Sequence, residues 1–250
     1  MPTRRQEALL RSLYTRHGRK KSGMCVAEGL RCCRELFAAA PESVEFTLVT
    51  PQLRATEAIP GEVIELTSEE IEKLGATCSS QGILSVARQP EDDTGAPETP
   101  FILLLDRLGD PGNFGTILRT ARAAGLAYLW YTKGSVDPYS DKAIRSALGA
   151  QFSMRLREFT DLAAALDAAE KYGYNKHFIT APHAGASCYA TANLYDKSVV
   201  VIGGEANGVG ENAPGERVTI PMPGDFESLN AAQAATIFIF EYVRRIMEGK

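Results

Sequence analysis

Short apolar runs of strand length, several of them ending in glycine or proline, dominate the hydrophobic pattern of this chain. The runs FILLLD (101–106) and VVVI (199–202) are continuous and aliphatic, which is typical of strands covered on both faces. A shorter run, RVTIPM (217–222), is closed by prolines. The pattern predicts three strands whose ends converge on one ligand, and therefore a cofactor site at those ends.

The segment after the first run predicts a turn followed by an amphipathic helix. In DPGNFGTILRTA (110–121), proline and glycine force the turn, Asn113 is placed to cap the helix, and the helix ends near Gly125. Arg119 points away from the apolar stripe and leans back toward the turn, where it can reach a ligand. A surface arginine is the alternative. The glycine spacing differs from G-x-G-x-x-G and does not favour a Rossmann dinucleotide site.

The two later turns also carry residues that can act on a ligand. Gly203 lets the backbone approach closely, and Glu205 can accept a hydrogen bond from a hydroxyl or an amine. Ser228 and Asn230 stand at the start of a helix that is predicted to run to about Met247. A solvated glycine loop and an ordinary helix cap are the alternative explanations for these residues.

Together the three segments closely resemble the motifs of the SpoU (TrmH) family of RNA 2′-O-ribose methyltransferases, part of the SPOUT superfamily. The matching residues are, in chain order, Asn113, Gly115, Arg119, Gly203, Glu205, Gly208, Ile220, Pro221, Met222, Gly224, Ser228, Leu229 and Asn230. The stretch VDPYSDKAIRSALGA (136–150) resembles the family's intervening segment. In it, Asp137 is expected to cap a helix, Pro138 to take the first helical position, and Arg145 to face the site.

The resemblance implies a fold, a cofactor and a reaction. The fold is α/β, with a SPOUT-type, mostly parallel sheet, helices on both faces, a C-terminal trefoil knot, and a small α/β RNA-binding domain before it. The reaction is methyl transfer to a ribose 2′-hydroxyl of RNA, in which Arg119 orients the hydroxyl and stabilises the developing alkoxide. The residues expected to hold Arg119 and the ribose are Asn113, Glu205, Ser228 and Asn230. The cofactor is S-adenosyl-L-methionine, and its expected binding residues are Gly203, Ile220, Leu229, Thr180, Ala181 and Met222.

Charge is distributed unevenly along the N-terminal part of the chain. Residues 4–34 contain nine lysines and arginines against two acids, whereas residues 35–100 contain thirteen acids against three bases. The overall formal charge of −4 therefore hides a basic stretch suited to a polyanion. This stretch resembles the ribosomal-protein-like substrate domain of many SpoU enzymes, so RNA contacts are predicted for Arg19, Lys20 and Arg145. A merely solvated basic helix is the alternative.

Composition also indicates where one domain ends and the next begins. Residues 1–90 are predicted to form the RNA substrate-binding domain, residues 91–99 an acidic, proline-rich linker, and residues 100–250 the methyltransferase domain. Within the first domain, a capping box predicts a helix that starts at Thr67 and stops at Gly75. Strands are predicted at 46–50 and 82–87.

Other features bear on the setting and the partners of the protein. No apolar run approaches the roughly 20 residues that span a bilayer, and the five cysteines are scattered, so a reducing cytoplasm is predicted. The histidines do not cluster in sequence, and no metal is expected. The helix at 230–245 is apolar nearly all round. In the resembling family this region packs in a homodimer, so a homodimer is predicted.

Alternatives remain for both substrate and activity. Ribosomal RNA is favoured over transfer RNA, by analogy with ribosomal RNA modifiers that carry a separate N-terminal RNA domain. A transfer RNA 2′-O-methyltransferase is the nearest alternative. A noncatalytic RNA-binding or ribosome-assembly protein would keep the fold without turnover. A Rossmann-type enzyme is disfavoured because the glycine fingerprint and the ribose-binding acid are missing.

Overall fold

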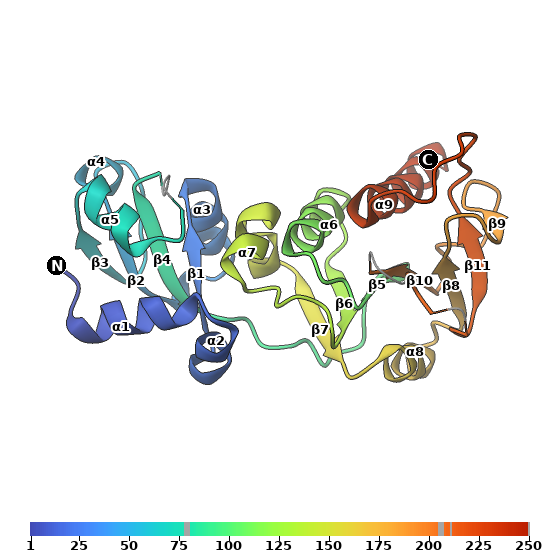
Figure 1. The fold of residues 1–250 in the computed structure, drawn as a ribbon, viewed down its shortest axis with the longest axis horizontal. Helices are drawn as coiled ribbons and strands as arrows, with labels where there is room; N and C mark the ends of the chain where they lie inside the picture. Colours follow the sequence, from blue (N-terminus) through green and yellow to red (C-terminus); the bar gives the residue numbers. More distant parts are fainter. Residues whose placement is uncertain (78–80, 205–207, 211, 250) are drawn as a thin grey trace. The chain divides into compact units, whose positions relative to one another are not determined.

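The protein consists of two compact units. The residues described by the computed structural model are 1–77, 81–204, 208–210 and 212–249. The N-terminal unit comprises Met1–Glu91 together with Asp137–Ser153, and the C-terminal unit comprises Asp92–Val136 and Met154–Lys250 (Figure 1). The segment 137–153 thus belongs to the N-terminal unit, although the chain on either side of it belongs to the C-terminal unit.

The N-terminal unit is built on a four-stranded sheet in the order β1-β4-β2-β3. Strand β4 pairs antiparallel with β1 and β2, and β3 pairs parallel with β2. The strands are β1 (Met24–Glu28), β2 (Val44–Val49), β3 (Glu62–Glu65) and β4 (Ile83–Arg88). The α-helices are α1 (Arg4–Leu13), α2 (Arg16–Ser22), α3 (Leu30–Ala39), α4 (Pro51–Arg54), α5 (Ser68–Leu74) and α7 (Asp141–Ala147). Strands β2 and β4 fall where the sequence predicts strands.

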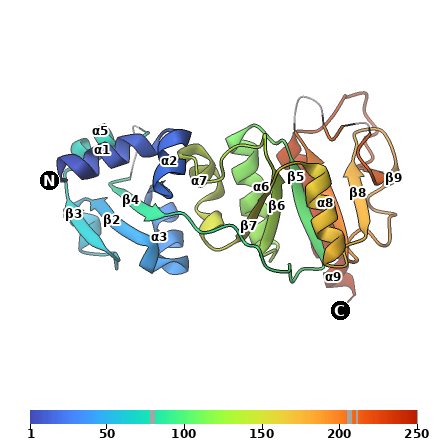
Figure 2. The ribbon, with the colours of Figure 1, turned by 90° about the horizontal axis from the view of Figure 1, so that it is seen from below.

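Side chains alternate between the two faces of this sheet, and helices cover both faces (Figure 2). Leu10 of α1 and Ile71 of α5 share a buried cluster with Leu48 of β2. On the opposite face, α3 places Cys33 Sγ 3.5 Å from Ser85 Oγ of β4. The sheet is therefore the centre of a three-layer α/β unit.

The predicted capping box at the start of α5 is confirmed. Thr67 Oγ1 accepts the backbone N–H of Glu70, and the Glu70 carboxylate accepts the backbone N–H of Thr67 at 2.8 Å. Gly75 is the C-cap, as its position after the last helical residue predicts. Local sequence alone sets both ends of this helix.

Ion pairs hold the segment 137–153 within the N-terminal unit. The buried Arg19 side chain donates from Nε to Asp137 Oδ2 at 2.7 Å, and Arg145 lies 3.5 Å from the buried carboxylate of Glu28. The predicted start of α7 is wrong. Ser140, not Asp137, caps the helix by accepting from the N–H of Ala143, because the Asp137 carboxylate is engaged by Arg19 and by the N–H of Tyr139.

The C-terminal unit contains a seven-stranded sheet in the order β7-β6-β5-β10-β8-β11-β9, and every pairing in it is parallel. The strands are β5 (Phe101–Asp106), β6 (Tyr128–Thr132), β7 (Arg155–Phe159), β8 (Lys176–Thr180), β9 (Ala186–Ser187), β10 (Ser198–Gly203) and β11 (Glu216–Thr219). The α-helices are α6 (Pro111–Ala123), α8 (Leu162–Lys171) and α9 (Ala231–Glu248). Figure 1 shows α8 on one side of the sheet and α6 and α9 on the other. The predicted parallel α/β sheet with helices on both faces is confirmed.

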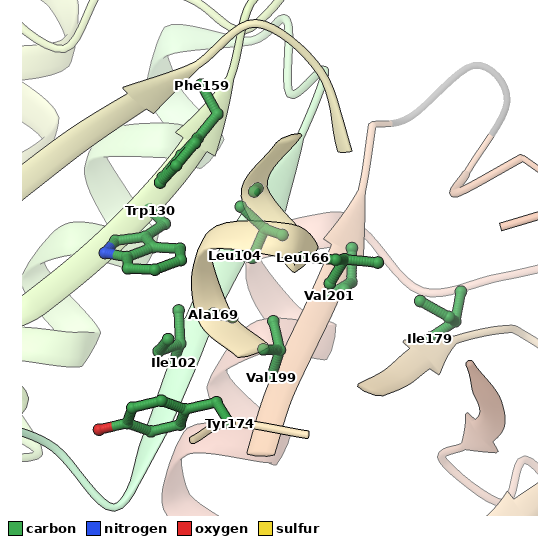
Figure 3. Close-up of a cluster of buried hydrophobic side chains, with 11 residues drawn as sticks. Ile102, Leu104, Trp130, Phe159, Leu166, Ala169, Tyr174, Ile179, Val199 and Val201 are labelled. Atoms are coloured by element: carbon green, nitrogen blue, oxygen red, sulfur yellow. The ribbon is translucent and has the colours of Figure 1, made fainter. Parts of the chain in front are cut away.

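The core of the C-terminal unit lies between the sheet and α8. Trp130 and Phe159 pack with ring centroids 4.6 Å apart, and Leu166 of α8 lies over Val201 of β10 (Figure 3). On the opposite face, Phe114 of α6 meets Tyr131 edge to face. Because both faces are buried, the central strands are continuously apolar rather than alternating. Among the described residues, no helix has both the length and the apolar character needed to cross a membrane.

Helix α9 is fastened near its C-terminus by a buried carboxylate. The side chain of Glu241 is 3% exposed and accepts hydrogen bonds from Arg244 and Arg245 at 2.7–2.8 Å. Arg245 also donates to the carbonyl oxygens of Cys188 and Thr191 at 2.6 and 2.7 Å, which ties the helix to the segment after β9. The hydrogen bonds from Arg244, followed by those from Arg245, lower the pKa of Glu241 from its ordinary 4.5 to about 2.

We expect Glu241→Gln to reduce the free energy of unfolding by about 2 kcal/mol at neutral pH, because it removes charged hydrogen bonds inside the protein. A lowered pKa stabilises the fold above the unfolded-state pKa, so the difference from wild type should shrink as pH falls from 4.5 toward 2. Urea unfolding across this pH range measures the difference in the free energy of unfolding between Glu241→Gln and wild type. Glu248→Gln, which removes the exposed partner of Arg244, should cost no more than about 0.5 kcal/mol. Equal losses in the two variants would contradict the assignment.

Candidate functional site

A cavity of about 290 Å³ lies at the carboxyl ends of strands β8, β10 and β11. Segments that follow these strands form its wall together with the start of α9. The lining residues are Thr180, Ala181, Pro182, Ile202, Gly203, Gly204, Gly208, Ile220, Met222, Ser228, Leu229, Asn230, Ala231, Ala234 and Phe238. Carboxyl ends of parallel strands are the usual location of ligand sites in α/β folds, and this volume approaches the roughly 300 Å³ of small ligand pockets.

The structure brings all six predicted cofactor-binding residues to this one cavity. They come from four separate segments of the chain, yet Thr180, Ala181, Gly203, Ile220, Met222 and Leu229 all line it. The sequence prediction did not include Ala234 and Phe238, which approach from α9. Both follow Asn230 at helical spacing, so the periodicity of α9 carries the signal that would have found them.

Two glycines are required where backbone segments pass each other beside the cavity. A Cβ at Gly203 would lie 2.2 Å from the carbonyl carbon of Gly208, and one at Gly204 would lie 2.3 Å from the carbonyl oxygen of Arg107. These distances are too short for any side chain. Glycine therefore permits the close approach of backbones that shapes this wall of the cavity.

Hydrogen bonds between neighbouring strand ends hold the rim in place. Thr180 Oγ1 donates to the Val201 carbonyl at 2.8 Å, and Thr219 Oγ1 donates to the Pro182 carbonyl at 2.8 Å. The N–H of Ala181 donates to the Val218 carbonyl at 2.9 Å. Each bond joins segments more than 20 residues apart in the sequence, so the wall is cross-linked by hydrogen bonds.

Asn113 and Asn230, 117 residues apart, meet beside the cavity. Asn230 Nδ2 donates to Asn113 Oδ1 at 2.9 Å, while Asn230 Oδ1 caps α9 by accepting from the N–H groups of Ala232 and Gln233. The prediction that Asn113 caps α6 is wrong. Asp110 is the cap, because its carboxylate accepts the backbone N–H of Asn113 at 2.7 Å, and the Asn113 side chain instead meets Asn230.

We expect Asn230→Ala to lower the free energy of unfolding by about 1 kcal/mol, because α9 loses its N-cap. Asn113→Ala removes the same contact between the two amides but leaves both helix caps, so its loss should be clearly smaller. Urea unfolding of the two variants measures the difference. A loss for Asn113→Ala as large as that for Asn230→Ala would show that the contact, not the cap, stabilises this region.

The remaining predicted catalytic residues differ in position. Ser228 is exposed and lines the cavity. Arg119 is exposed on α6 and does not line the cavity. Glu205 lies outside the described residues. One chain thus gathers Asn113, Ser228 and Asn230 around the cavity.

The predicted RNA-binding residues differ in whether their side chains are exposed or paired within the protein. Lys20 is exposed, whereas Arg19 is 5% exposed and donates both to Asp137 and to the Leu13 carbonyl. Arg145 is paired with Asp141 at 3.0 Å and with Glu28. These contacts give Arg19 and Arg145 a role in holding the segment 137–153, and they leave Lys20 as the cation of the three that faces solvent freely.

The described cysteines are buried free thiols. Burial raises the pKa of Cys32 and of Cys188 to about 11, and that of Cys33 to about 12. A thiol in that range is protonated at neutral pH and is a poor nucleophile. The described cysteines are therefore not suited to act as nucleophiles.

The fold and the cavity define an α/β protein that binds a ligand at the carboxyl ends of a parallel sheet. Residues 100–240 match the model of the SpoU rRNA Methylase family, and residues 9–85 match that of the MRM3-like substrate binding domain. The chain belongs to the SpoU rRNA methylase family.

Individual relatives cover nearly the whole chain. A Bacillus subtilis protein, "23S rRNA (guanosine(2553)-2'-O)-methyltransferase RlmP", is 29% identical over 92% of this chain and 92% of its own length. The mitochondrial rRNA methyltransferase 3A of Danio rerio is 27% identical over 92% of this chain, which spans 66% of that relative's length. The structure of the SpoU methyltransferase AviRb from Streptomyces viridochromogenes, in complex with AdoMet, has a TM-score of 0.84 at 25% identity and covers 100% of both chains.

Proposed function

We propose that this protein transfers a methyl group from S-adenosylmethionine to a ribose 2′-hydroxyl of structured RNA, with ribosomal RNA as the favoured substrate. The observation that carries this function is the cavity at the ends of β8, β10 and β11, which gathers residues of the second and third motifs, while Asn113 of the first motif is hydrogen-bonded to Asn230 of its wall. The relatives named above are rRNA methyltransferases, and one structural neighbour binds AdoMet.

The chemistry of the cavity fits S-adenosylmethionine. Ile220, Leu229 and Phe238 offer apolar surface for a flat base, and the exposed backbone near Gly203 offers groups that recognise its polar edge. The absence of side chains at Gly203 and Gly204 lets neighbouring backbone pack closely behind this wall. When bound, the cofactor supplies a methyl group already activated on a sulfonium.

The protein's own residues then position the RNA and assist loss of the hydroxyl proton. Asn113 and Asn230 fix each other beside the cavity, and Ser228 offers a hydroxyl at its edge. Arg119 orients the 2′-oxygen and stabilises the charge that develops as the proton leaves, since a guanidinium remains protonated. The proton passes to solvent or to an RNA phosphate. Glu205 is included in this set from the motif match alone.

A homodimer is part of this function. Arg119 does not line the cavity of its own chain, and in a dimer the second copy brings an Arg119 to each cavity. Helix α9 supports this arrangement, because Phe240, Ile246 and Met247 are 47%, 41% and 71% exposed on it. A mass close to twice 27.1 kDa by light scattering at micromolar concentration would support the dimer, and a monomer mass would contradict it.

The N-terminal unit supplies the RNA-binding surface, and the two-domain division at residues 91–99 fits the two family matches. Lys20, with the neighbouring exposed Arg16 and Lys21, forms its basic surface. We place the protein in the cytoplasm, where the buried cysteines stay reduced. Ribosomal RNA is favoured over transfer RNA because the two relatives named above, each of which covers 92% of this chain, carry rRNA methyltransferase names.

A trefoil knot in the C-terminal unit is also part of the proposal. Its support is the pair of close passages between segments distant in the sequence, at Gly204 with Arg107 and at Gly185, where a Cβ would lie 2.0 Å from the Arg217 carbonyl oxygen. Glycine at each passage allows segments to be threaded past one another.

The test is incubation of the purified protein with labelled S-adenosylmethionine and separate pools of unmodified ribosomal and transfer RNA, followed by nucleoside analysis. A 2′-O-methyl nucleoside in the ribosomal pool alone is the expected result. Label in the transfer RNA pool alone would reassign the substrate. No label in either pool, despite measurable cofactor binding, would favour a noncatalytic ribosome-assembly factor.

A further inference from the structure

A second cavity also lies at the carboxyl ends of the parallel strands. Its volume is about 500 Å³, and its wall comes from the residues that follow β5, β6 and β7 and from the loop near Pro214. The two cavities share no lining residue among those described. The second cavity therefore needs its own explanation.

Arg107 is held rigidly at the wall of this cavity. Its backbone has a φ of +52°, which is uncommon for a residue with a side chain, and its N–H donates to Thr132 Oγ1 at 3.0 Å. The guanidinium lies 3.1 Å from Asp106 Oδ2, and Asp106 is 2% exposed. Glycine at position 134 leaves room for the Arg107 stem, since a Cβ there would lie 3.1 Å from Arg107 Cγ. A buried carboxylate thus fixes a guanidinium whose side chain is still 53% exposed.

Lys133 stands beside Arg107 on the neighbouring strand end. Leu105 of β5 pairs with Tyr131 of β6 in parallel register. Arg107 comes two residues after Leu105, and Lys133 comes two residues after Tyr131, so the two cations occupy equivalent positions at neighbouring strand ends. Lys133 is exposed, and within the described part of the chain it forms no ion pair. Two cations therefore lie at adjacent strand ends, which are roughly 5 Å apart.

The acidic side chains among the described lining residues of this cavity, Asp106 and Asp161, are already engaged. Asp106 accepts from Thr132 Oγ1 at 2.8 Å and pairs with Arg107 through its other oxygen. Asp161 caps α8 by accepting the N–H of Ala164 at 2.9 Å. Since both carboxylates serve internal partners, Lys133 and the outer face of Arg107 remain to bind an anion that enters the cavity.

We propose that this second cavity binds backbone phosphates of the RNA strand that carries the methylated nucleotide, an inference that rests on the proposed function. Arg107 acts as a fixed fork and Lys133 as a mobile cation. Both cavities lie at the carboxyl ends of the β-strands, so one RNA strand can reach both of them. Contacts of this kind position RNA without reading its bases.

The test compares Lys133→Gln and Arg107→Asn with wild type for binding of a labelled, mixed-sequence single-stranded RNA at increasing salt. Each substitution should lower the slope of log affinity against log salt by about 0.7, the value for one phosphate contact on a single strand. Asparagine tolerates the left-handed backbone at position 107. Lys171→Gln is the matched control, because Lys171 is an exposed lysine at the opposite end of α8. It should bind with the wild-type slope.

Affinity for S-adenosylmethionine, measured by calorimetry, should be unchanged in all three variants. Wild-type slopes for both Lys133→Gln and Arg107→Asn would overturn the inference, even if the protein methylates RNA. If Arg107→Asn does not fold, Lys133→Gln decides alone. A lowered slope in a protein that methylates no RNA would instead keep the phosphate contact and reject the proposed reaction, so the two failures are distinguishable.

Discussion

Arg119→Ala is expected to lower the rate of methyl transfer at least about 100-fold, while S-adenosylmethionine binds with close to wild-type affinity. The reason is positional. Arg119 does not line the cavity on its own chain, so its loss removes no contact around the cofactor-binding residues. What disappears is the cation that orients the 2′-oxygen and stabilises the developing negative charge. Single-turnover methylation of ribosomal RNA and calorimetric titration of the cofactor measure the two effects separately.

The matched control for this experiment is Arg122→Ala. Arg122 is an exposed arginine one turn further along α6, so the control removes the same charge from the same helix. It should leave the methylation rate within about threefold of wild type, because Arg122 is not one of the predicted catalytic residues. Wild-type turnover in Arg119→Ala would remove Arg119 from the mechanism. Equal losses in the two variants would point to RNA attraction rather than catalysis.

The second large effect is expected from Gly203→Ala. The added Cβ would lie 2.2 Å from the Gly208 carbonyl carbon and 2.3 Å from the Val209 nitrogen, so backbone segments beside the cavity must separate. Overpacking of this kind costs about 1–3 kcal/mol of stability. We expect affinity for S-adenosylmethionine to fall more than about tenfold, because the displaced backbone forms the cavity wall. Calorimetric titration and urea unfolding measure the two losses.

Gly224→Ala is the control for this substitution. Gly224 lies in the loop between Met222 and Ser228, and a Cβ there would meet nothing within 4 Å. Cofactor affinity and stability should therefore stay close to wild type. Normal binding in Gly203→Ala would show that the cofactor does not depend on the close passage of these backbones. A loss of binding in both variants would indicate that any change near the cavity is disruptive.

Strands and helix caps that depend only on neighbouring residues in the sequence were predictable. The run at 101–106 forms β5 with the predicted bounds. Its consecutive apolar side chains can all be buried only in a strand that is covered on both faces of the sheet. The capping box at Thr67 forms as predicted, since both partners lie within one turn of helix. The motif residues at the cofactor cavity were found by their resemblance to a known family, and not by periodicity.

Predictions failed where several polar groups compete for one partner. Asn113 was expected to cap α6, but the cap is Asp110, three residues earlier, whose side chain accepts the backbone N–H of Asn113. Asp137 was expected to cap α7, but its carboxylate pairs with Arg19, 118 residues away in the sequence. In both cases the side-chain type was suitable for the predicted role. The tertiary fold supplied a partner that no local pattern contains.

The sequence by itself determined strands β2, β4, β5, β10 and β11 and both ends of α5, because those depend on burial and on hydrogen bonds within a few residues. Only the tertiary structure decided that Asn113 meets Asn230, that Arg119 lies outside the cavity of its own chain, and that Arg107 and Lys133 stand side by side at a second cavity. These outcomes depend on strand order and on the close passage of distant backbone segments, which sequence spacing does not encode.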